Sequence, residues 1–80
     1  MEQTTRILSF RRSSSSKIAA QRRQLQEELA RTRILTNQAY SSFNHSCDHD
    51  LIESYVYEIN ALQARYNYLL RQVKELEAQP

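Results

Sequence analysis

The chain has 80 residues, of which 40% are hydrophobic and 25% charged, with a net charge of +2. A chain this short forms one small domain with a limited core, so we expect it to self-associate. It has no glycine, a single proline at Pro80 and a single cysteine, Cys47, which excludes an internal disulfide and most turn chemistry. Good helix formers are abundant, and no apolar run suits a signal peptide or a membrane span. These features predict an all-α cytoplasmic protein.

Charge is unevenly distributed along the chain. Residues 1–40 contain eight basic and three acidic residues, a net charge of +5, whereas residues 41–80 contain three basic and six acidic residues, a net charge of −3. A basic front half could meet nucleic acid or an anionic membrane surface. Internal charge balance and solubility explain the same asymmetry without an external partner.

Residues 1 to about 15 are predicted to form a disordered or fraying basic arm, because Ile7, Leu8 and Phe10 are their only sizeable apolar groups. Four serines at residues 13–16 precede a helical pattern, so one of them is expected to be the N-cap. The preceding Arg11 and Arg12 also resemble a basic kinase target, in which a phosphate would lie favourably at a helix N-terminus.

A first helix is predicted from about residue 16 to about residue 43. The stripe that indicates it comprises Ile18, Leu25, Leu29, Thr32, Thr36, Ala39, Tyr40 and Phe43. Arg22, Thr32 and Thr36 occupy positions where a dedicated coiled coil would have leucine or isoleucine, so this helix needs a partner helix. The exposed Ile34 on its opposite side is ordinary.

A short polar loop, about residues 44–49, separates this helix from a second one at about residues 50–78. Asp48 or Asp50 is expected to cap the second helix, with Glu53 completing a capping box after Asp50. So short a connection predicts an antiparallel hairpin.

The loop contains the only residues that resemble a chemical site. They are His45, Cys47, Asp48, His49 and Asp50. Thiolate and imidazole ligate zinc, but a structural zinc site normally uses two separated ligand pairs, and the chain supplies no second pair. Catalysis by Cys47 would need a pocket and oxyanion donors, which an exposed turn does not offer. We therefore expect no metal, no cofactor and no enzymatic activity.

The second helix has the strongest pattern in the chain. Its seam comprises Ile52, Tyr55, Ile59, Leu62, Tyr66, Leu69, Val73 and Leu76, which alternate at spacings of three and four. Branched residues at the first heptad position with leucine at the fourth favour parallel two-stranded coiled coils. Leu51, Val56 and Leu70 widen the face, which fits packing against two neighbours. We therefore expect a dimer of hairpins, a four-helix arrangement.

A second stripe lies roughly opposite the seam, at spacings of four, three and four. It comprises Tyr57, Ala61, Ala64 and Tyr68. Either helix one or another protomer covers this face, or the face is a docking surface for a partner protein, since exposed aromatic residues often anchor interfaces. Stacking on single-stranded nucleic acid, helped by Arg65 and Arg71, is a minor alternative.

The run DLIESYVYEINALQARYNYLLRQVKEL, with the preceding AYSSFN, resembles the YaaL-like family of small uncharacterised bacterial proteins. The resemblance covers about 40 residues around the second helix, and the sequence departs from it at His49, where a proline would be expected. It implies a short cytoplasmic helical protein with no assigned activity, and it carries over no catalytic or ligand residues.

The sequence therefore predicts a helical hairpin that self-associates and serves as a small protein-interaction module or adaptor. The alternative, from a different class, is an accessory nucleic-acid-binding protein that uses the basic front half. The two differ in their response to salt, because binding through phosphates weakens steeply as salt rises.

Overall fold

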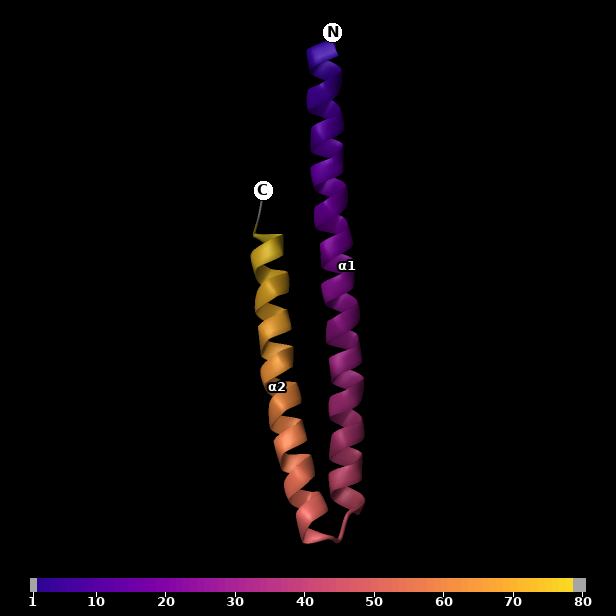
Figure 1. Ribbon diagram of the computed structural model, residues 1–80, viewed down its shortest axis with the longest axis vertical. Coiled ribbons are helices and arrows are strands. Elements are labelled where there is room, and N and C mark those ends of the chain that lie inside the picture. Colours follow the sequence, from indigo (N-terminus) through magenta and orange to yellow (C-terminus); the bar gives the residue numbers. More distant parts are fainter. Residues whose placement is uncertain (1, 79–80) are drawn as a thin grey trace.

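Two long helices form an antiparallel hairpin (Figure 1). The computed structural model describes the backbone of residues 2–78 and the side chains of residues 16–78. Helix α1 runs over Glu2–His45 and helix α2 over His49–Glu77, and this described part contains no strand. The prediction of an all-α two-helix hairpin is confirmed.

Helix α1 begins much earlier than the sequence analysis expects. Residues 2–15 were predicted to be an irregular arm, but their backbone is helical from Glu2 onwards. The segment contains neither glycine nor proline, and a serine inside a helix costs only about 0.5 kcal/mol relative to alanine. Nothing in these residues therefore terminates a helix. The serines at residues 13–16 lie within α1 and do not form its N-cap.

The turn between the helices comprises only residues 46–48. The amide of Ser46 donates to the carbonyl oxygen of Phe43 at 3.3 Å, which closes the last turn of α1. Asp48 has an extended backbone, and its Oδ1 accepts a hydrogen bond from the amide of Leu51 at 3.0 Å. Asp48 is therefore the N-cap of α2. The expected capping box between Asp50 and Glu53 does not form, because Leu51 occupies the third helical position after this cap.

The two helices pack along one face each. On α2 the buried residues are Ile59, Leu62, Leu69, Val73 and Leu76, with Ile52, Tyr55 and Tyr66 partly buried. On α1 Thr32 and Ala39 are buried, and Ile18, Leu25, Leu29, Thr36 and Phe43 are partly buried. Ala39, Ile59 and Leu62 form the central cluster, against which Phe43 packs. Tyr40, expected in the α1 stripe, lies at its edge and is exposed.

Two threonines occupy seam positions of α1 without leaving polar atoms unpaired. The hydroxyl of Thr32 donates to the carbonyl oxygen of Glu28 at 2.7 Å, and that of Thr36 donates to the carbonyl oxygen of Thr32 at 2.8 Å. A hydroxyl bonded to its own helix presents mainly its methyl group to the partner helix. Burying a hydroxyl without a hydrogen-bond partner would be costly. Because both hydroxyls are paired, the α1 seam can contain threonine.

Helix α1 extends well beyond the end of α2 (Figure 1). Leu25 and Leu76 line one groove and Thr32 and Leu69 another, so the last turn of α2 lies opposite about residue 24 of α1. Residues 2–23 continue past this point, and we call them the overhang. The molecule is a rod of 71 × 15 × 13 Å, and a helix of 44 residues accounts for about 66 Å of that length at 1.5 Å per residue.

Candidate interaction surface

The stripe of two tyrosines and two alanines on α2 lies in solvent. Tyr57 is 66% and Tyr68 51% exposed, and Ala61 and Ala64 between them are also exposed. Helix α1 therefore does not cover this face, which removes one of the two structural explanations for the pattern. We call these four residues the outer tyrosine face. The tyrosines are eleven residues apart, about 16 Å along the helix, so both reach one flat partner surface.

Tyr68 also borders a shallow groove between the helices. The groove has a volume of ≈ 290 Å³ and is lined by Glu28, Arg31, Thr32, Leu35, Arg65, Tyr68 and Leu69. Leu35, like Tyr68, is exposed and apolar, and two arginines line the same groove. An aromatic ring and an aliphatic side chain framed by arginines have the composition that protein interfaces favour. The sequence stripe alone did not reveal Leu35 or Arg31, because they come from the other helix.

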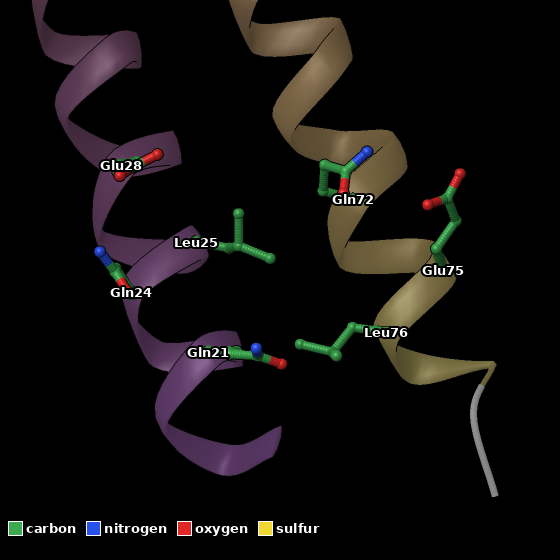
Figure 2. Close-up of a pocket in the computed structure, with 7 residues that line it drawn as sticks. All are labelled: Gln21, Gln24, Leu25, Glu28, Gln72, Glu75 and Leu76. Atoms are coloured by element: carbon green, nitrogen blue, oxygen red, sulfur yellow. The ribbon is translucent and has the colours of Figure 1, made fainter. Parts of the chain in front are cut away.

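A second groove continues along the same edge toward the end of α2 (Figure 2). Leu25 and Leu76 point toward each other across the space between the helices, with Gln21 beside them (Figure 2). The groove, ≈ 420 Å³, is also lined by Gln24, Glu28, Gln72 and Glu75. Its walls are amides and carboxylates around a small apolar floor. Both charged side chains in its lining, Glu28 and Glu75, are exposed to solvent.

The opposite edge of the hairpin carries hydrogen bonds between the helices. Arg33 donates from Nη2 to the hydroxyl of Tyr66 at 3.0 Å, and its guanidinium carbon lies 5.8 Å from the centre of that ring. Gln63 donates from Nε2 to the hydroxyl of Tyr40 at 2.9 Å. Arg33, Gln63 and Tyr66 contribute to a groove of ≈ 310 Å³. These pairs join the two helices at this edge, and no sequence pattern within either helix identifies them.

Large exposed apolar side chains gather toward the turn. Among the described side chains they are Ile34, Leu35, Tyr40, Leu51, Val56, Tyr57 and Tyr68. Six of these seven lie between residues 34 and 64, a segment that contains four carboxylates and no lysine or arginine. We call residues 34–64 the acidic end. Its formal charge, with histidines neutral, is −4.

The residues at the turn do not assemble into a metal site. In the part of the chain that the structure describes, no group of three or more histidine, cysteine, aspartate or glutamate residues is placed to hold a metal ion. Cys47 is free and exposed. The Nδ1 of His45 lies 2.7 Å from the carbonyl oxygen of Ser41, so this nitrogen carries a proton and donates it to that oxygen. Asp48 serves as a helix cap.

Comparison with protein families assigns the chain to a known family. A family model described as protein of unknown function (DUF2508) matches residues 9–79. The chain belongs to the DUF2508 family. The match starts within the overhang and spans the turn and α2, so the family unit includes most of the extension of α1 as well as the paired helices.

No curated protein and no solved structure shows a significant match to the DUF2508 chain. Within residues 2–78, neither helix combines the length and apolarity that crossing a membrane requires.

Proposed function

We propose that this DUF2508 protein is a non-enzymatic protein-interaction module of the cytoplasm that self-associates, with a dimer as the favoured form. The supporting observation is the concentration of exposed apolar side chains at the acidic end and on the outer tyrosine face. Monomeric soluble proteins rarely expose large contiguous apolar patches unless a partner covers them. The similarity to YaaL-like proteins agrees with a small helical protein and supports no particular activity.

The total surface of the chain supports the same proposal. A compact monomer of 9.5 kDa has about 5,000 Å² of accessible surface. The hairpin exposes 6817 Å², an excess of about 1,800 Å². A stable interface buries about 800 Å² on each partner. The excess therefore allows one interface with a second copy and a further one with a different protein.

The experiment that tests the interaction role is affinity capture from a nuclease-treated lysate. The wild-type chain is compared with Tyr57→Glu/Tyr68→Glu, which introduces two charges on the outer tyrosine face. A Gln26→Glu/Ala30→Glu variant is the matched control, because both residues are exposed, lie on α1 and are outside the acidic end. Circular dichroism verifies that all three are equally helical. We expect a specific protein to be retained by the wild type and the control and lost by the tyrosine variant.

Equal retention of the same proteins by all three chains would contradict docking through the outer tyrosine face. Failure of all three to retain any protein would contradict the interaction role itself. A retained protein is then identified and its binding to the purified hairpin measured directly, so that indirect capture is excluded.

The second candidate function is nucleic-acid binding. Lys17, Arg22, Arg23, Arg31 and Arg33 are all exposed on α1, which favours contact with phosphates. Binding of this kind has an affinity that falls steeply with salt, with a slope of about −0.7 per neutralised phosphate on single strands. Titration of a labelled single strand at several salt concentrations tests it. Binding that is absent at low salt would exclude this function.

A further inference from the structure

The ends of the rod carry opposite charges. The overhang, residues 2–23, contains six basic residues and one acidic residue, a net charge of +5. The acidic end, residues 34–64, has a charge of −4. The overhang is the part of α1 that extends past the last turn of α2, with only Gln21 still bordering Leu76, and the acidic end contains the turn at the opposite end of the rod (Figure 1). Within one molecule these two segments cannot meet, because α1 is a continuous helix.

The chemistry of the two segments is complementary in a second respect. Six of the seven exposed large apolar side chains among the described residues lie at the acidic end. The sequence of the overhang combines its basic residues with Ile7, Leu8, Phe10 and Ile18. A basic helix that also carries apolar groups suits an acidic surface with exposed apolar side chains, because both attraction and burial favour the contact.

Charge also decides between the ways in which two copies can associate. Packing one overhang on another would bring two segments of +5 together, and packing two acidic ends together would join two segments of −4. Like charges at an interface are unfavourable. Only an overhang against the acidic end of another copy joins opposite charges.

The lengths fit a closed arrangement. The overhang has 22 residues, and the part of α1 that pairs with α2, residues 24–45, also has 22, so each is about 33 Å long. When two rods lie side by side in opposite directions, residue 2 of one copy is level with residue 45 of its partner. Residues 2–13 of each overhang, which include Arg6, Arg11 and Arg12, are then level with residues 34–45 of the other copy, the α1 part of its acidic end. The two contacts are identical and related by a two-fold axis, the commonest symmetry of homo-oligomers.

We propose that the DUF2508 hairpin forms an antiparallel two-fold dimer in which the overhang of each copy packs along the acidic end of the other. This inference rests on the proposed function, since it identifies a second copy as one partner of the interaction module. It adds the orientation of the copies and the segments in contact. Tyr57, Ala61 and Ala64 of the outer tyrosine face belong to the acidic end, and Tyr68 lies beyond it.

The first test reverses charge on each side of the proposed contact. Arg11→Glu/Arg12→Glu/Lys17→Glu changes the overhang from +5 to −1, and Glu53→Lys/Glu58→Lys changes the acidic end from −4 to 0. Sedimentation equilibrium at low salt measures dimerisation of each chain. We expect the dimer dissociation constant of each variant alone to be at least tenfold higher than that of the wild type.

A mixture of the two variants gives the sharper result. A mixed dimer retains one wild-type contact, because the native overhang of the second variant meets the native acidic end of the first. We expect the equimolar mixture to form more dimer than either variant alone. The control is Arg71→Glu/Lys74→Glu, which changes charge on α2 outside the acidic end. These residues are level with about residues 17–20 of the partner's overhang, so the added negative charge should not weaken the dimer. A mixture no better than its components would overturn the proposal.

The native Cys47 reports the orientation. In the antiparallel dimer the two Cys47 thiols lie at opposite ends, so a bis-maleimide should not link wild-type chains. A Thr4→Cys variant places a second thiol about 60 Å along α1 from Cys47 of the same chain, which makes linkage within one chain impossible. Efficient linkage of Thr4→Cys chains into covalent dimers is the expected result.

Linkage of wild-type chains through Cys47 would show a parallel dimer and overturn the inference. A chain that sediments as a monomer at all concentrations would also overturn it. If such a monomer still binds a protein through Tyr57 and Tyr68, the interaction role stands without the dimer, so the two proposals fail separately.

Discussion

Replacing Leu69 by alanine should remove a large part of the stability of the hairpin. Leu69 is only 3% exposed and lies on the seam of α2 opposite the buried Thr32. Leucine to alanine in a protein core costs 2–5 kcal/mol, and the lower values belong to sites that can relax. Here the site borders an open groove of ≈ 290 Å³, so the helices can close in and water can enter. We therefore expect a loss of about 2 kcal/mol, reduced by a few tenths because alanine is the better helix former.

Urea denaturation followed by circular dichroism measures this loss. Leu51→Ala is the matched control, because Leu51 is on the same helix but 50% exposed, and its loss should be about 1 kcal/mol or less. Each titration is repeated over a range of protein concentrations, since association with a second copy makes the apparent stability concentration-dependent. Equal losses for the two variants at every concentration would refute the assignment of the seam as the core of the hairpin.

Three smaller effects follow from individual hydrogen bonds, and the same denaturation experiment measures them. Asp48→Ala should lower the free energy of unfolding by about 1 kcal/mol, whereas Asp48→Asn, which retains the cap acceptor, should lower it much less. Tyr66→Phe keeps the ring but removes the acceptor for Arg33, so a loss of about 0.5 kcal/mol is expected, and a loss above about 2 kcal/mol would contradict this description. Ser46→Ala should raise stability by up to about 1 kcal/mol, because Oγ of Ser46 is buried without a hydrogen-bond partner; a clear loss would show that this hydroxyl is satisfied in solution.

The second helix could be predicted closely because its information is local. A strict three-four alternation of large apolar residues specifies one face of a helix whatever lies opposite it. The five residues buried on α2 all belong to this alternation. The turn is also local, since it needs only a short polar segment and a capping aspartate. The choice of Asp48 over Asp50 is not local, because the tight turn leaves only residues 46–48 outside the helices.

The first helix was harder because its pattern is weak and its beginning is unmarked. Tyr40 has the residue type of a core position, but its hydroxyl accepts a hydrogen bond from Gln63 at the edge of the hairpin. Polar threonines occupy the true seam, where their hydroxyls bond to α1 itself. A run of serines suggests a helix start when no other signal is present. A helix continues wherever no residue terminates it. The absence of a terminating residue is difficult to weigh against the weak helix propensity of the serines.

The candidate surfaces depend on which residues the two helices leave uncovered, and this is a property of the pair. The outer tyrosine face is visible as a spacing on α2, but its exposure follows only from the presence of a single partner helix on the opposite side. The overhang exists because α1 has 44 residues and α2 has 29. With α2 ending at Glu77, residues 2–20 of α1 extend past its last turn. An isolated helix of that length is marginal in water, so the overhang gains most from a second molecule.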